Sequence, residues 1–302
     1  MTLNLYWRLD PAAEPARGEP HERPATGYLP REARTRSLTR YDYYAQVARA
    51  AAITGFDGLF VAYRPDSDDS QIVAAAVARG APRLRLIPEF PSTVGSAVYA
   101  AKQAVSFQRA THNRLGWAIV SNPADEEDAE RIREFLHVAR GVHGQQPFDH
   151  KGQFFAVQGG GFKAPLANVP FPPVFLSGAD EAALQLSAHA ADIHLFDDVD
   201  LDRLRERAET LDRLTLAADR NVAIGVVARV TARETDDEAA GAGGEGIAGS
   251  YAAVADRLVA LHAAGVTHLV LSAPQSVEEA YRIGQFVLPL VRARTSALRT
   301  AA

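Results

Sequence analysis

Polar side chains stand at or directly after the ends of several short apolar runs of this chain. Arg8 follows one run, Tyr63 and Arg64 follow another, and Ser177 and Gly178 follow a third. Arginine presents a planar fork of donors that matches carboxylate, sulfonate or phosphate, and it keeps its proton near neutral pH. The arginines could therefore anchor an anion or stabilise charge, but they could not act as bases. The full set of such positions comprises Arg8, Asp10, Tyr63, Arg64, Glu89, Ser121, Asn122, Ser177, Gly178, Asp197, Asp198, Arg229, Ser272 and Gln275.

Arg229 stands among apolar residues on the long run from 222 to 230. This pattern predicts a buried arginine, and an unpaired buried charge is costly enough to require a partner. The partner is either an anionic group on substrate or cofactor, or a structural carboxylate such as Glu89, Asp197 or Asp198. Both interpretations stay open from the sequence.

A strand end, a glycine and a helix start come together in the segment LSGADEAALQL, residues 176–186. Exposed backbone N–H groups and the helix dipole at such a point suit a phosphate. Asp180 and Glu181 occupy the first helical turn, however, where carboxylates cap the same N–H groups. The segment is therefore weak evidence for phosphate binding.

Other chemistries find little support in the sequence. The nine histidines include no pair at metal-ligand spacing on one helix face, so we predict no metal site. No G-x-S-x-G elbow is present, so a Ser-His-Asp triad has no basis. The chain contains no cysteine, which excludes disulfides, thiolate metal sites and a cysteine nucleophile.

Eight apolar runs, most of them followed by a helical pattern, are the elements that would position these residues. The last unit shows the pattern best: apolar residues at helical spacing precede Gly265, and an apolar, β-branched strand follows. Strands that are apolar on both faces belong to a parallel sheet covered by helices. Eight such units favour a (β/α)8 TIM barrel over a doubly wound sheet, with the site at the carboxyl ends of the strands. The predicted strands are Leu3–Trp7, Gly58–Ala62, Arg83–Ile87, Leu115–Val120, Pro173–Leu176, Ile193–Phe196, Val222–Val230 and His268–Ser272.

Three connections are longer than ordinary loops. The first, Leu9 to Thr39, is rich in proline and charge, and we expect it to lie over the carboxyl ends of the strands. The second, Asp149 to Pro173, contains a short strand-like FFAV and a run of three glycines, which indicates a hairpin insertion before the fifth strand. The third, Asp236 to Ser250, is acidic and then rich in glycine and alanine, which favours a flexible loop.

Size and charge limit the function classes. A chain of 302 residues that is 47% hydrophobic can form a single barrel domain, so we expect one domain over residues 1–302. The net charge of −5 with interspersed signs indicates neither a nucleic-acid surface nor an acidic tail. No apolar run approaches the roughly 20 residues of a membrane span, and no secretory signal is visible, so we expect a cytoplasmic protein.

Several segments resemble the bacterial luciferase-like flavin monooxygenases, most closely the alkanesulfonate monooxygenase branch. The resemblance covers most of the chain. It implies a TIM barrel with an insertion, reduced flavin mononucleotide (FMN) delivered by a separate reductase, oxygen as co-substrate, and a homodimer or higher homo-oligomer. The matching segments are LNLYW, ITGFDGLFVAYRPDSDD, SAVYAAKQAVSFQRATHNRLGWAIV, HKGQFFAV, FPPVFLSG, VAIGVVARVTARETDDEA and LVLSAPQSVEEAYRIGQFVLPLV.

Most functional positions of that branch differ in this chain. Ser67 stands where sulfonate-cleaving relatives have a cysteine, and Val227 and Arg229 stand where they have arginine and histidine. Their tyrosine after the last strand aligns with Pro274, and their phosphate-binding tyrosine is absent near Arg131. Their phosphate-binding serine pair aligns with Ala179 and Asp180. These positions do not support sulfonate cleavage by the usual residues.

We therefore expect a divergent flavin monooxygenase acting on a small, possibly anionic, organic substrate. Two alternatives stay open: a family member with weak or no flavin binding that works as a binding or partner subunit, and a deazaflavin-dependent oxidoreductase. The predicted catalytic residues are Tyr63, Arg64 and Arg229. The predicted cofactor contacts are Ser121, Asn122, Ser177, Gly178 and Ala179, and the predicted substrate contacts are Trp7, Arg8, Glu89, Ser272 and Gln275.

Overall fold

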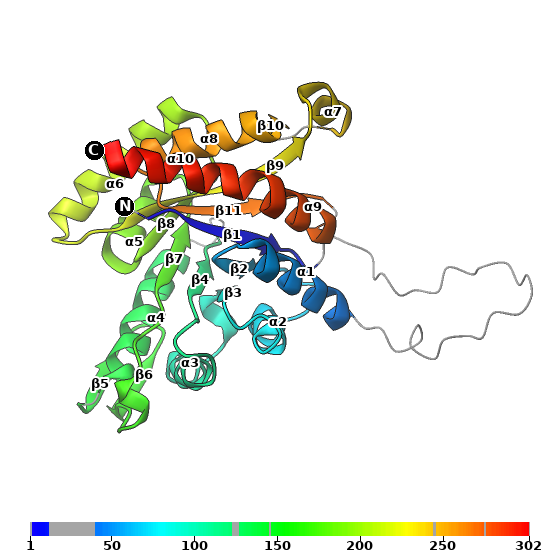
Figure 1. Cartoon of the computed structure of the whole chain (residues 1–302). Helices are drawn as coiled ribbons and strands as arrows, with labels where there is room; N and C mark the ends of the chain where they lie inside the picture. Colours follow the sequence, from blue (N-terminus) through cyan, green and yellow to red (C-terminus); the bar gives the residue numbers. More distant parts are fainter. Residues whose placement is uncertain are drawn as a thin grey trace, which may run out of the picture.

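A computed structural model of the chain describes residues 2–11, 40–122, 127–144, 146–243, 246–274 and 276–301. Its centre is a closed ring of eight parallel strands, which confirms the predicted TIM barrel (Figure 1). The order around the ring is β9, β11, β1, β2, β3, β4, β7 and β8, and a pairing between β8 and β9 closes it. These strands are β1 (Asn4–Leu9), β2 (Gly58–Val61), β3 (Arg85–Pro91), β4 (Trp117–Val120), β7 (Val174–Ser177), β8 (Ile193–Phe196), β9 (Ala223–Arg233) and β11 (His268–Ser272).

Helices surround the ring. A π-helical turn at Ile283–Val287 separates the last two, and short 3-10 turns occur at Ser92–Val94 and Leu166–Asn168. None of the helices in the described ranges is long and apolar enough to cross a membrane. The helices are α1 (Arg40–Thr54), α2 (Ser70–Val77), α3 (Ala97–Thr111), α4 (Asp128–His143), α5 (Glu181–Ala190), α6 (Leu201–Ala217), α7 (Asp236–Gly241), α8 (Tyr251–Ala263), α9 (Ser276–Arg282) and α10 (Leu288–Ala301).

Alternation along the strands divides the buried side chains into two cores. One fills the inside of the barrel, and the other lies between the strands and the helices and includes Leu5, Leu59 and Leu86. Gly58 lets strands approach closely, because a Cβ there would lie 2.6 Å from the Arg85 carbonyl oxygen. The barrel is therefore packed rather than hollow, and a ligand must bind at one end. The inner core comprises Tyr6, Phe60, Ile87, Ala118, Phe175, Ile193, Leu195 and Val270.

The predicted hairpin insertion is confirmed. Strands β5 (Phe148–Lys151) and β6 (Ala156–Gly160) form an antiparallel pair before β7, beside α4 (Figure 1). Glu134 on α4 holds the hairpin against that helix. Its carboxylate accepts from the backbone N–H of Phe155 at 2.8 Å and from His150 Nε2 at 3.0 Å. These bonds hold the pKa of Glu134 below its usual value against the opposing effect of burial.

The prediction of a flexible loop over Asp236–Ser250 is wrong for the described part of that segment. It contains the short helix α7 and the strand β10 (Ile247–Ser250), which extends the sheet alongside β9. A capping box starts the helix: Thr235 Oγ1 accepts from Glu238 N, and the Glu238 carboxylate accepts from Thr235 N. The T-x-x-E signature at Thr235–Glu238 favours a helix start, whereas the glycines that follow it favour a loop.

Candidate functional site

The carboxyl ends of the eight barrel strands meet at one end of the ring, called the barrel mouth below, because every strand pair in the ring is parallel. Tyr63, Ser177 and Arg229 therefore lie at the same end, as predicted. Strands β1 and β3 extend further than predicted, so Arg8 and Glu89 lie within them rather than after them, whereas Arg229 lies within β9 as predicted. The mouth collects all the described candidate residues except Trp7.

Arg64, after β2, and Asp10, after β1, form an ion pair at the mouth. Arg64 Nε lies 3.1 Å from both carboxylate oxygens of Asp10, and Nη2 makes a further contact with Oδ2. The hydrogen bond to Asp10 raises the pKa of Arg64, and its charge is thus fixed. The pair joins the ends of two neighbouring strands and holds the Arg64 guanidinium in one orientation.

Glu89 sits on the inward face of β3, two residues beyond Ile87 of the inner core. Its Oε2 accepts a hydrogen bond of 2.9 Å from the backbone N–H of Tyr63. The Ser70 hydroxyl donates to the Glu89 backbone carbonyl. Glu89 therefore fixes the turn that carries Tyr63 and keeps a carboxylate at the mouth.

Arg8 also faces inward, because Tyr6, two residues earlier, belongs to the inner core. Its guanidinium carbon lies 5.8 Å from the centre of the Phe60 ring. Trp7 pairs with Leu271, which places Arg8 beside Ser272, and Ser272 in turn pairs with Arg229. Arg8 and Ser272 are both partly exposed, as residues at the edge of a packed interior should be.

The assignment of Trp7 as a substrate contact is wrong. Trp7 is completely buried in the core between β1 and the helices, where its ring packs on Phe56 with centroids 5.3 Å apart. Its indole N–H donates to Ser276 Oγ at 2.9 Å. Adjacent residues on a strand point to opposite faces, so the inward position of Arg8 requires Trp7 to face outward.

The prediction that Arg229 is buried is also wrong, since its side chain is exposed. Its neighbours Ala228, Val230, Thr231 and Ala232 are buried, so Arg229 is the exposed residue of an otherwise buried part of β9. Of the carboxylates considered as structural partners, Asp197 and Asp198 each lie 3.7 Å from Arg207 on α6. The cost of a buried charge therefore does not argue for an anion at Arg229.

The turn after β7 is organised as a capped helix start. Asp180 Oδ1 accepts from Ala183 N at 2.8 Å, the N–H that a phosphate at this turn would also use. Gly178 has φ +140°, and a Cβ there would lie 2.4 Å from the Ala183 side chain. Ser177 and Gly178 are partly exposed and Ala179 is exposed. A phosphate here would meet the Asp180 carboxylate, so the turn fits a flavin phosphate poorly.

A buried histidine, missed in the sequence, holds this turn. His194 on β8 is fully buried; its Nε2 lies 3.1 Å from the Gly178 carbonyl oxygen and its Nδ1 lies 2.7 Å from Ser187 Oγ. A carbonyl only accepts, so Nε2 carries the proton and Nδ1 accepts from the serine hydroxyl. Burial lowers the pKa of His194 to about 4 and keeps the ring neutral.

The remaining candidates have mixed outcomes. Ser121 after β4 is partly exposed, and Asn122 is exposed, with its backbone N–H donating to Asp128 Oδ2 at 2.6 Å. Gln275 and most of the long first connection, residues 12–39, lie outside the described residues. Their predicted places at the mouth stay predictions.

Two serine hydroxyls in the turns after β2 and β3 were not singled out as site residues. The hydroxyl oxygens of Ser67 and Ser92 are buried, and the described part of the structure offers neither a hydrogen-bond partner. A buried hydroxyl without a partner is costly and marks a place where a ligand or water completes the bonding. The resemblance to the sulfonate-cleaving relatives points to Ser67, which stands at their cysteine position, and no signal in the sequence points to Ser92.

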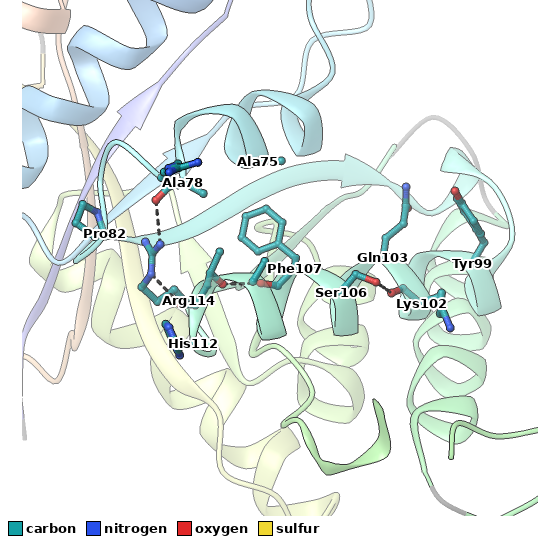
Figure 2. Close-up of a pocket in the computed structure, with 13 residues that line it drawn as sticks. Ala75, Ala78, Pro82, Tyr99, Lys102, Gln103, Ser106, Phe107, His112 and Arg114 are labelled. Atoms are coloured by element: carbon teal, nitrogen blue, oxygen red, sulfur yellow. Dashed lines mark hydrogen bonds between the residues drawn. The ribbon is translucent and has the colours of Figure 1, made fainter. Parts of the chain in front are cut away.

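A hollow of about 850 Å³ lies outside the barrel between α2 and α3 (Figure 2). Arg114 lies at one end, where its guanidinium donates to the carbonyl oxygens of Ala78, Ala81, Leu84 and Thr111. Tyr99 lies toward the other end and is 64% exposed. No predicted site residue lines this hollow, and Arg114 acts there as a structural brace.

The chain is similar to one protein family in sequence and to several solved structures in fold. The sequence profile of a family described as luciferase-like monooxygenase matches residues 20–242. A riboflavin lyase structure with modified FMN and riboflavin superposes with TM-score 0.81 at 15% identity, covering 98% of this chain and 92% of the lyase. EDTA monooxygenase from Chelativorans sp. BNC1 gives 0.79 at 18% identity, covering 97% and 94%. The coenzyme F420-dependent tetrahydromethanopterin reductase from Methanopyrus kandleri gives 0.73 at 14% identity, covering 96% and 99%. At these identities the likeness supports the fold alone.

Proposed function

The chain belongs to the luciferase-like monooxygenase family, and we propose that it is an FMN-dependent monooxygenase of the two-component type. In this proposal a separate reductase supplies reduced FMN, and oxygen and a small organic substrate meet it at the barrel mouth. A bound flavin supplies the redox chemistry, and the protein positions and shields the reactants.

One observation carries the proposal: the inside of the barrel is apolar and packed, whereas charged groups from neighbouring strands gather at its mouth. Arg8, the Arg64–Asp10 pair and Glu89 come from or follow β1, β2 and β3, which are consecutive in the ring. This short arc carries two arginines and two carboxylates. It suits a site that binds and orients a polar ligand.

Within that site we assign catalytic roles to Tyr63, Arg64 and Arg229. Tyr63 is the only one of the three that can donate a proton from its side chain near neutral pH. Arg64, held by Asp10, would stabilise developing negative charge. Membership of the alkanesulfonate monooxygenase branch is likewise a proposal, and the sequence differences at Ser67, Val227 and Pro274 weigh against its usual chemistry.

A second candidate function is a partner subunit that has lost flavin affinity. The Asp180 cap favours it, because a carboxylate at the phosphate position repels the cofactor. A third candidate is a coenzyme F420-dependent oxidoreductase. The coenzyme F420-dependent tetrahydromethanopterin reductase has the same fold, and this likeness supports the third candidate.

We also propose that the protein forms a homodimer or higher homo-oligomer. The hollow between α2 and α3 with the exposed Tyr99 is an apolar surface of the kind that subunit interfaces cover. A second copy of this chain is the occupant that the proposal assigns to it.

Titration of the purified chain with oxidised FMN, reduced FMN and coenzyme F420 under anaerobic conditions tests the function. We expect reduced FMN to bind, and to bind more tightly than coenzyme F420. Tighter binding of coenzyme F420 would support the third candidate. Binding of none of the three would contradict flavin dependence and favour the partner subunit.

A further inference from the structure

We infer that Arg8 binds the oxyanion head of the substrate, which makes the substrate a small organic carboxylate or sulfonate. The inference deepens the proposed function and rests on it. In this assignment Arg8, which β1 places inside the mouth, binds the anion, and the exposed Arg229 does not.

The direction of the Arg8 side chain is set by β1. Tyr6 lies in the inner core, and Leu5, Trp7 and Leu9 lie in the outer core, so Arg8 occupies the inner face. The Phe60 ring lies 5.8 Å from its guanidinium carbon and supports the group from one side. Phe60 itself belongs to the packed interior, so Arg8 lies immediately above the floor of the mouth.

The charge of Arg8 is available for a ligand. Among the described residues no carboxylate lies within ion-pair distance of Arg8, although other arginines near the mouth are paired: Arg64 with Asp10, and Arg207 with Asp197 and Asp198. A partly buried guanidinium without a counter-charge is a poor structural element. A guanidinium fork above an apolar floor matches a ligand with a planar or tetrahedral oxyanion and a short apolar tail.

The site for this anion lies across the ring from the turn after β7. Three strands separate β1 from β7 in either direction around the ring, so Arg8 and Ser177 stand on opposite walls of the mouth. A phosphate bound at the turn after β7 would therefore not compete with an anion at Arg8. This geometry leaves the middle of the mouth for the reacting groups of cofactor and substrate.

Neighbouring side chains set the orientation of the anion. The Ser272 hydroxyl, beside Arg8 on β11, can donate a second hydrogen bond to an oxyanion. Glu89 stands two strands away on the other side and its carboxylate repels the same group. The oxyanion is thus directed toward the wall formed by β1 and β11.

Calorimetric titration of the full chain with hexanoate and with hexan-1-ol, in the presence and absence of reduced FMN, tests the assignment. We expect the wild-type protein to prefer hexanoate and Arg8→Met to weaken hexanoate binding by about tenfold or more, with little change for the alcohol. Arg8→Lys keeps the charge without the fork and should lie between the two. Arg205→Met, on the exposed face of α6, is the matched control and should bind like wild type.

The assignment is overturned if hexanoate binds wild type and Arg8→Met equally, if hexanoate has no advantage over the alcohol, or if neither ligand binds with or without FMN. The melting temperature of each variant is measured alongside, and Arg8→Lys decides the case if Arg8→Met is destabilised. A failure of FMN binding with the preference for hexanoate intact would overturn the proposed cofactor and leave the anion site standing.

Discussion

The guanidinium of Arg64 and the carboxylate of Asp10 join the ends of β2 and β1, with Nε 3.1 Å from both oxygens. The Arg64 side chain is 45% exposed and that of Asp10 is 17% exposed, so solvent screens the pair. We expect a coupling free energy of about 0.5–1 kcal/mol. Unfolding Asp10→Ala, Arg64→Ala and the double variant in urea measures it as a double-mutant cycle. A coupling above about 2 kcal/mol would show that the pair is a major structural link rather than a device for orienting Arg64.

Asp180→Ser should tighten FMN binding, by about tenfold, because it removes a carboxylate from the phosphate position and leaves a hydroxyl that can donate. Serine caps helices about as well as aspartate, so α5 should persist. Asp69→Ser is the matched control: Asp69 caps α2 in the same way, accepting from Ile72 N at 2.9 Å, on the β2 side of the barrel. Equal or weaker FMN binding by Asp180→Ser would remove the phosphate from this turn.

The free energy of unfolding should fall as the pH is lowered from 6.5 toward 4. Burial lowers the pKa of His194 to about 4 from its ordinary 6.5, so in this window the unfolded chain binds the proton and the folded chain does not. The free energy of unfolding that depends on neutral His194 is fully present above pH 6.5. Roughly 3 kcal/mol of it is lost as the pH falls from 6.5 to the pKa of the folded state. Urea unfolding at several pH values measures it.

His194→Gln should flatten this dependence without abolishing it, because burial also lowers the pKa of His268 to about 4. Glutamine can still donate to the Gly178 carbonyl and accept from the Ser187 hydroxyl. The control His189→Gln alters an exposed histidine on the adjacent helix α5. Identical slopes for wild type and His194→Gln would show that His194 does not carry the effect.

Trp7→Phe should lower the free energy of unfolding by about 2 kcal/mol and leave hexanoate and FMN affinities unchanged. The substitution leaves a cavity beside Phe56 and removes the indole donor from Ser276, which is itself buried. Urea unfolding, followed by fluorescence of the remaining Trp117, gives the stability. A loss of ligand affinity in a folded variant would restore Trp7 to the site.

Tyr99→Glu should shift the protein from an oligomer to a monomer, because a charge inside an apolar interface is unfavourable. Light scattering after gel filtration measures the mass in solution. Leu216→Glu, at a residue 81% exposed on α6, is the control and should leave the mass unchanged. A monomeric wild type, or an oligomeric Tyr99→Glu, would refute the assignment of the α2–α3 hollow to a second copy.

Local sequence was sufficient to predict the units of the barrel. Each strand is a short apolar run bounded by helical patterns, and Ile193–Phe196 and His268–Ser272 begin and end as predicted. Strands near charged residues were predicted too short: β3 continues through Glu89 to Pro91 because an inward side chain at the mouth need not be apolar. The short helix α7 was missed although its capping box was present.

Only the tertiary structure decided which residues share the site. In a strand buried on both sides, alternation defines two faces but nothing local shows which face is inside, and this is why Trp7 was placed in the site together with Arg8. Closure of the ring decides which face is inside. It also places Arg8 across the mouth from Ser177 and brings Asp10 within hydrogen-bond distance of Arg64. These relationships join residues from different strands, and no pattern within one strand contains them.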